Sequence, residues 1–191
     1  MYILERMIEL YIIGAVVFVL GITLWILFNG MVRAKNIVIE AFSGIDVQLK
    51  KRHELIPNLI EAVKGYNAHE AEILEKLVLT RNDANNSNIS DTVRQDSSIT
   101  GALKRFRINV EAYPDLKANT QFLKLMDNLS TVEDELSMAR RYYNGATRDF
   151  NTKIEVFPTV LIAKMMGFLP QEFYEIEQEA ERNVPELDLN D

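Results

Sequence analysis

The chain has 191 residues, of which 48% are hydrophobic and 26% are charged, and its formal net charge is −7. This composition excludes wholesale disorder, and the length suffices for one domain with a real hydrophobic core. The sequence has no cysteine and only two histidines. These counts exclude disulfides, thiolate metal sites and multi-histidine sites, and the negative charge argues against nucleic acid as a partner.

The first feature along the chain is an apolar stretch. After a short N-terminal tail of residues 1–9, the nineteen residues from Leu10 to Phe28 carry no charge. As a helix they would span about 28 Å, close to the thickness of a bilayer's hydrocarbon core. A secretory signal peptide, the competing interpretation, would need a basic start, a shorter apolar stretch and a cleavage site of small residues. Because the sequence lacks these, we predict a transmembrane helix over residues 10–28.

Basic residues on the two sides of this stretch predict its orientation. The N-terminal side carries Arg6, whereas the C-terminal side carries Arg33, Lys35 and the run Lys50–Arg52. The positive-inside rule then places the body of a single-pass protein of the cell membrane in the cytoplasm. The pattern leaves open whether the anchor continues as helix through Asn29-Gly30.

Residues 29–156 have the pattern of a helical domain. Apolar residues recur at spacings of three and four in four seams, the last of which holds a heptad repeat for more than four heptads, and no segment alternates with the period of a strand. The seams are Val38, Phe42, Ile45 and Leu49; Ile56, Leu59, Val63, Tyr66, Ile73 and Leu77; Ile99, Leu103, Phe106, Val110 and Tyr113; and Phe122, Leu125, Leu129, Val132, Leu136, Ala139, Tyr143, Ala146, Phe150 and Ile154. We therefore predict an all-α fold, an antiparallel four-helix bundle with long helices followed by a short C-terminal helix.

Prolines and polar runs set the expected helix boundaries. Pro57 suits the first turn of the second helix. Residues 82–91 are rich in Asn, Asp and Ser and predict a loop. Pro114 ends the third helix, and Asp115 can cap a fourth helix that runs to about Val156.

The apolar segment of residues 157–170 admits three interpretations. It could fold back and close the end of the bundle, lie in the membrane interface, or form a methionine-rich contact for another protein or subunit. The residues expected to make the membrane-interface or oligomer contact are Phe157, Leu161, Ile162, Met165, Met166 and Leu169.

The C-terminal tail of residues 171–191 is strongly acidic. It holds eight acidic residues and one basic residue, which together account for the net charge of the whole chain. Such a tail is typical of a solubilising segment, and the alternative is a docking peptide for a basic partner.

No catalytic motif is present. The sequence has no nucleophile elbow, zinc-protease helix, phosphate-binding loop or dinucleotide fingerprint. Neither His53 nor His69 belongs to the Glu-x-x-His pattern of di-iron bundles, and His69-Glu70-Ala71-Glu72 is more typical of a charged helix face than of a metal site. We expect no enzyme activity, catalytic residue, metal or cofactor.

Polar residues lie beside the apolar seams more densely than packing needs. They could form interhelical contacts that fix the register of the helices, or they could line a groove for a partner. The residues of this candidate groove are Asp46, Gln48, Arg52, His53, Asn58, Lys64, Arg140, Asn144 and Asn151.

Two parts of the sequence resemble the LemA family. The first is the continuous run from Ile45 to Tyr66, which closes with His69-Glu70. The second is a series of short motifs: Ala139-Arg140, Tyr143-Asn144, Phe150-Asn151, Ile154, Phe157-Pro158, Gly167-Phe168 and Glu172-Phe173. Phe150 stands where the family often has tyrosine, and Thr147 where it often has valine. The resemblance implies a bacterial single-pass membrane protein with an antiparallel helical bundle and no catalytic residues. Association of some relatives with magnetosome membrane formation implies membrane organisation.

Three classes of function remain at this stage. The leading hypothesis is a non-enzymatic, membrane-anchored scaffold that self-associates, because Gly14 and Gly21 would allow close approach of two anchors. Its partners would be the lipid bilayer, further copies of the chain and another membrane protein. The alternative is an adaptor that binds a specific protein through the polar groove or the acidic tail, and an enzyme is the third class.

Overall fold

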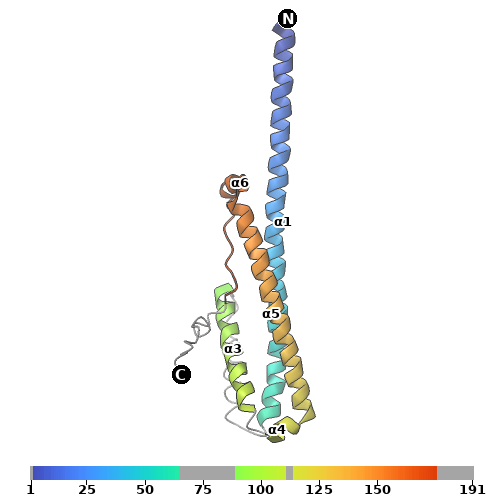
Figure 1. The fold of residues 1–191 in the computed structure, drawn as a ribbon, viewed down its shortest axis with the longest axis vertical. Coiled ribbons are helices and arrows are strands. Elements are labelled where there is room, and N and C mark those ends of the chain that lie inside the picture. Colours follow the sequence, from blue (N-terminus) through green and yellow to red (C-terminus); the bar gives the residue numbers. More distant parts are fainter. Residues whose placement is uncertain (1, 65–88, 111–113, 176–191) are drawn as a thin grey trace, which may run out of the picture. The chain divides into compact units, whose positions relative to one another are not determined.

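The computed structural model describes residues 2–64, 89–110 and 114–175, and these residues form helices and no strand. The helices are α1 (Tyr2–Lys64), α3 (Ile89–Val110), α4 (Pro114–Ala118), α5 (Thr120–Glu155) and α6 (Thr159–Met166) (Figure 1). The all-helical prediction is therefore confirmed over this part of the chain. The second seam beyond Lys64, most of the predicted loop and the acidic tail beyond Glu175 lie outside the described residues.

The chain divides into two compact units. The first unit comprises Met1–Ser43 and Tyr142–Phe173, and the second comprises Gly44–Arg141 and Tyr174–Asp191. Helices α1 and α5 each contribute to both units, so each unit contains a segment of both helices.

In the first unit, α1 and α5 pair in antiparallel directions. Lys153 of α5 donates to the carbonyl oxygen of Gly30 of α1 at 3.2 Å. Further along α1, the ring of Phe42 meets the ring of Tyr143, which lies earlier on α5, edge to face with centroids 5.7 Å apart. Apolar residues at seam positions of both helices are buried here, including Val38 and Phe150. Before residue 27 every described side chain of α1 is exposed, and this part of α1 extends beyond α6 (Figure 1).

A glycine ends α6 and turns the chain back along the first unit. Gly167 has φ 71°, a left-handed conformation that glycine adopts without steric cost. The N–H of Phe168 then donates to the carbonyl oxygen of Ala163 at 3.0 Å, as in a Schellman motif. This turn directs the Phe168 ring toward two others, Phe28 at 6.1 Å and Phe150 at 6.3 Å between centroids.

The second unit has its own hydrophobic core. Buried residues of α1, α3, α4 and α5 form one cluster, consisting of Ile56, Leu59, Ile60, Val63, Ile99, Leu103, Phe106, Leu116, Phe122 and Leu129. Phe106 and Phe122 meet edge to face with centroids 6.3 Å apart. The heptad spacing on α3 and α5 explains the cluster, because residues three and four apart share one helix face.

Two expected boundaries are wrong. Pro57 does not open a second helix but lies inside α1, where it is exposed. Proline has no N–H to donate to the residue four positions earlier. Burial of the neighbouring Ile56 and Leu59 stabilises the helix despite this missing hydrogen bond. The fourth helix is interrupted: α4 ends at Ala118, and the Asn119 side chain caps α5 by accepting the N–H groups of Gln121 and Phe122 at 2.9 and 3.3 Å.

The predicted anchor and the helix that follows it are one continuous helix. Helix α1 passes through Asn29 and Gly30 without a break. The Asn29 side chain donates to the carbonyl oxygen of Trp25 one turn earlier, at 2.8 Å, so this polar residue is accommodated within the helix.

Neighbouring residues of α5 provide a test of the core. Phe122→Ala removes a ring that is 1% exposed, and we expect the free energy of unfolding to fall by about 3–5 kcal/mol. Leu123→Ala, at a position that is 50% exposed, should cost far less. Urea unfolding in mild detergent measures both. Equal losses would contradict the assignment of the core.

Candidate functional site

The polar centre of the second unit is the carboxylate of Asp96 on α3. Its side chain is 0% exposed, and Arg52 of α1, itself 1% exposed, forms an ion pair with it at 2.7 Å between Nη2 and Oδ1. The same guanidinium donates through Nη1 to Thr100 of α3 and to Glu133 of α5, each at 3.1 Å. Arg52 therefore joins three helices of this unit through one planar group.

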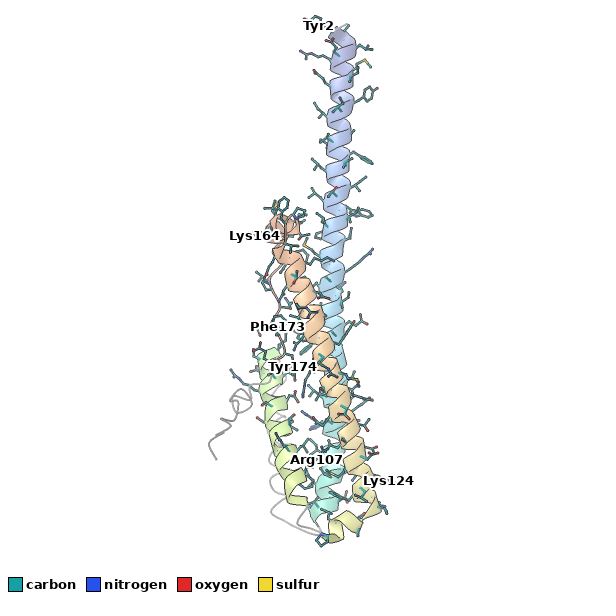
Figure 2. All side chains as sticks on the ribbon, in the orientation of Figure 1. Tyr2, Arg107, Lys124, Lys164, Phe173 and Tyr174 are labelled. Carbon is teal, nitrogen blue, oxygen red and sulfur yellow. The ribbon has the colours of Figure 1, made fainter. Side chains whose placement is uncertain are left out.

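The other oxygen of Asp96 is also engaged. Arg140 of α5 forms an ion pair with Oδ2 through Nη2, and the hydroxyl of Tyr174 donates to Oδ2 at 2.6 Å. The Arg140 guanidinium carbon also lies 5.6 Å from the centroid of the Tyr174 ring, within the range of a cation–π contact. Tyr174, labelled in Figure 2, belongs to the non-helical residues that follow α6. We call Arg52, Asp96, Arg140 and Tyr174 the Asp96 network.

Charge balance explains why this network is tolerated inside the protein. A buried carboxylate without partners carries a large desolvation cost. Here the carboxylates of Asp96 and Glu133 are matched by the guanidinium groups of Arg52 and Arg140, so the four charges sum to zero. Removing the charge of one of these side chains would leave its partners charged and poorly solvated.

The hydroxyl of Tyr174 is kept protonated by its surroundings. Burial, followed by the neighbouring Asp96 carboxylate, raises the pKa of Tyr174 well above its ordinary value. Desolvation disfavours the phenolate, and the carboxylate repels it. The phenol therefore remains a donor to Asp96 throughout the neutral range.

In the first unit, two side chains hold the chain after α6 by its backbone. Asn151 donates to the carbonyl oxygen of Gln171 at 2.9 Å and accepts the N–H of the same residue at 2.8 Å. Tyr143 donates to the carbonyl oxygen of Glu172 at 2.8 Å, and burial raises the pKa of this tyrosine. Paired contacts to backbone atoms fix the path of residues 171–172 without depending on their side chains.

The nine residues of the candidate groove are divided between the units. Asn144 and Asn151 belong to the first unit, and the other seven belong to the second. The structure brings Arg52 and Arg140 together on Asp96. Asp46, Asn58 and Lys64 are exposed, whereas Gln48 and His53 are half-buried. Arg52, Arg140 and Asn151 contact other residues of the same chain.

The apolar residues near α6 lie mainly at the surface. Thr159 and Ala163 are the buried residues of α6. Ile162 is half-buried, while the exposed members of the predicted contact are Phe157, Leu161, Met165, Met166 and Leu169. The segment therefore does not bury its predicted apolar face as a core plug would.

Sequence reasoning missed Asp96, Glu133 and Tyr174. A signal for Asp96 was present, because it lies seven residues before Leu103 on the third seam, and Arg52 lies seven residues after Ile45 on the first. Opposite charges at core positions of two helices predict a buried ion pair. Tyr174 carried no comparable signal, because it follows the last helix.

Among the described residues, no group of three His, Cys, Asp or Glu could hold a metal ion. The Asp96 carboxylate is enclosed by its partners and has no exposed surface with which to meet a substrate. The network's chemistry is that of fixing helices and the chain after α6 in place.

Comparison with known proteins defines the family. The family model described as "LemA family" matches residues 41–189. The chain belongs to the LemA family. The matched region contains the whole Asp96 network and α6, and it begins after the apolar stretch of α1.

Individual relatives are more distant. Protein LemA of Metamycoplasma hominis is 32% identical over 143 residues, which cover 72% of this chain and 64% of that protein. Magnetosome proteins MamQ 1 and MamQ 2 of Paramagnetospirillum magneticum are each 29% identical over 80 residues, or 42% of this chain and 29% of theirs. The first relatives are thus matched over less than two thirds of their own length. Neither LemA nor MamQ is the name of an enzyme.

Removing the charge of Asp96 tests the network. Asp96→Asn keeps the shape of the side chain but removes the carboxylate shared by the buried Arg52 and the half-buried Arg140, and we expect the free energy of unfolding to fall by about 3–5 kcal/mol. The matched control is Glu135→Gln, which breaks the 3.0 Å pair with Lys51 where both side chains are over one third exposed. That pair should contribute less than about 1 kcal/mol. Urea unfolding measures both, and a comparable loss in the two variants would refute the central role of Asp96.

The raised pKa of Tyr174 predicts an alkaline loss of stability. In the unfolded chain tyrosine ionises near pH 10, whereas in the folded chain Tyr174 resists ionisation, so its contribution is complete below that pH and is lost as pH rises further. We expect the free energy of unfolding to fall less steeply between about pH 9 and pH 11 in Tyr174→Phe than in the unaltered protein. Tyr142→Phe, at an exposed position, is the matched control. Identical slopes in all three proteins would contradict the prediction.

Proposed function

We propose that this LemA-family protein is a non-enzymatic scaffold, anchored in the cell membrane by one helix, that self-associates and organises the membrane or its proteins. The observation that carries the proposal is the exposure of α1 before residue 27. Among the described helices, α1 alone is long and apolar enough to cross a bilayer, and none of its apolar window is buried within the chain. An apolar surface of this size requires a cover, and hydrocarbon supplies it.

The orientation follows from the flanking charges. Arg33 and Lys35 come directly after the apolar stretch and are exposed, and Lys50 and Lys51 follow further along α1. The positive-inside rule favours the cytoplasm for this side. We accordingly assign a single-pass topology with both α5 and α6 on the cytoplasmic side.

We further infer that the body is an antiparallel four-helix bundle. The antiparallel contacts of α1 with α5 support this arrangement, as does the convergence of α1, α3 and α5 on Asp96. Bundles of this type leave their surfaces available for assembly while their cores fix the register.

Self-association is supported by two glycines in the apolar stretch. Gly14 and Gly21 lie one heptad apart on α1, and a Cβ built at either meets nothing within 4 Å. Small residues allow the backbones of two membrane helices to approach closely, which strengthens their packing. The names of the MamQ relatives, magnetosome proteins of Paramagnetospirillum magneticum, support extending this assembly to the organisation of a membrane.

The mass of the protein in mild detergent tests the proposal. Light scattering should give a discrete oligomer for the full chain. Replacing both glycines, by Gly14→Ile with Gly21→Ile, should lower that mass, because bulky side chains keep two helices apart. The matched control, Val19→Ile with Ile26→Val, alters two residues at the same spacing on another part of the helix surface and should leave the mass unchanged.

A chain that is monomeric at every concentration would refute the scaffold. It would favour the adaptor function, in which a specific protein binds the exposed polar residues or the acidic tail. The contacts already made by Arg52, Arg140 and Asn151 within the chain count against these three as the adaptor's binding residues.

A further inference from the structure

We propose that the exposed apolar face of α6 lies in the headgroup region of the leaflet from which α1 emerges, as a second membrane contact of the same chain. This lipid-facing surface consists of Phe157, Leu161, Met165, Met166 and Leu169. The inference rests on the proposed membrane anchor. It adds a lipid-binding surface within the region matched to the family, outside the transmembrane stretch.

The depth of α6 follows from two contacts in the first unit. The ring of Phe168, two residues after α6, meets the ring of Phe28, the last residue of the predicted anchor. Close by, Lys153 near the end of α5 contacts the backbone of Gly30. Helix α6 is therefore held at the level where α1 would leave the hydrocarbon core, which is the depth of the headgroups.

The orientation of α6 places its apolar residues outward. Ala163 is 2% exposed and Thr159 is 5% exposed, whereas Met165 is 85% exposed and Phe157 is 80% exposed. Figure 2 shows the side chains around Lys164 projecting from this end of the first unit. In water this arrangement is unfavourable, because small residues are buried while large apolar ones are solvated. At a membrane interface the same arrangement is favourable.

The position of α6 is fixed from both ends. The hydroxyl of Thr159 donates to the carbonyl oxygen of Val156 at 2.8 Å, which ties the start of α6 to the end of α5. At the other end, the Gly167 turn commits Phe168 to the rings of Phe28 and Phe150. These contacts turn Thr159 and Ala163 inward and leave Met165 and Met166 outward.

The charges near α6 favour lipid, rather than a second copy of the chain, as the partner that covers its apolar face. Residues 156–171 contain Lys164 and no acid, and residues 10–39 contain Arg33 and Lys35 and no acid. Lys164, Arg33 and Lys35 are all exposed. Anionic headgroups complement this positive charge. Two copies that met through α6 would instead bring their Lys164 side chains near each other, with no acid from these segments to offset the repulsion.

Tryptophan quenching by brominated lipid tests the proposal with the full chain. Trp25 is the sequence's one tryptophan, so the unaltered protein reports on the anchor. Met165→Trp combined with Trp25→Phe reports on α6. Arg148→Trp combined with Trp25→Phe is the matched control, because Arg148 is an exposed residue of the same unit about 10 Å before the end of α5. Each protein is placed in phosphatidylcholine and phosphatidylglycerol vesicles whose acyl chains carry bromine near the headgroup.

The expected result is strong quenching of Trp25 and of the Met165→Trp reporter, and little quenching of the Arg148→Trp reporter. An interfacial helix buries its apolar face by about 5–10 Å, which brings position 165 within reach of these bromines. Adding Leu161→Asp and Met166→Asp should abolish quenching of the Met165→Trp reporter while circular dichroism shows the helices intact.

Two other results would overturn the proposal in distinguishable ways. If Trp25 is quenched but the Met165→Trp reporter is quenched no more than the Arg148→Trp reporter, α6 lies outside the membrane and only this inference fails. Concentration-dependent shielding of the Met165→Trp reporter from aqueous iodide would then identify a second copy as the occupant. If Trp25 itself is not quenched, the membrane anchor fails, and with it the proposed function.

Discussion

The second unit is organised around one negative charge that cannot reach water. Asp96 is buried on α3, and α1 and α5 must each supply an arginine at the right level to neutralise it. Apolar seams can slide by a heptad at modest cost, because one leucine is much like the next. A carboxylate between two arginines has no equivalent position one heptad away, so it fixes the register of the helices. Tyr174 extends this constraint to the chain beyond α6.

In the first unit a few contacts likewise hold the chain after α6. Asn151 and Tyr143 bind the backbone of residues 171 and 172, so the chain after α6 is fixed by atoms that every residue has. The aromatic rings of Phe28, Phe150 and Phe168 then join α1, α5 and the end of α6 through side chains alone. The two kinds of contact complement each other: hydrogen bonds determine the path of the chain, and the rings contribute the buried apolar surface.

The helical character and the buried faces could be predicted from periodicity, because spacing on a helix is a local property. Val38, Leu103, Leu136 and Phe150 are buried as their seams predicted. The boundaries between helices were harder to predict. Pro57 is tolerated on an exposed face because its neighbours Ile56 and Leu59 are buried. Asn119 separates α4 from α5 just before the heptad pattern that starts at Phe122, so the pattern itself does not mark the break. The partners of Asp96 depend on three separate helices meeting, which no single segment encodes, although the charges at seam positions pointed toward such a pair.

The outward face of α6 illustrates a different limit. The spacing of Leu161, Met165 and Met166 indicated an apolar face but could not distinguish the core from lipid, because both environments favour the same residues. The burial of the small residues Thr159 and Ala163 shows which side of α6 faces the rest of the chain, and small side chains give weak signals in a hydrophobicity pattern. Identification of the family adds no information at this point, since a fold shared with LemA proteins does not by itself specify which surface meets which partner.

The unbroken passage of α1 through Asn29 and Gly30 has a geometric consequence. A membrane anchor joined to its body by a flexible linker lets the body swivel, so pairing of anchors says nothing about how the bodies face. Here the helix proposed to cross the bilayer is the same continuous helix that Lys153 and Phe168 contact, through Gly30 and Phe28. The fold therefore determines on which side of α1 the helix α6 lies. If two copies of α1 packed against each other through Gly14 and Gly21, that packing would also set the direction from one copy's α6 to the other's. Repeated pairing of this kind would arrange the α6 helices at regular orientations along the membrane.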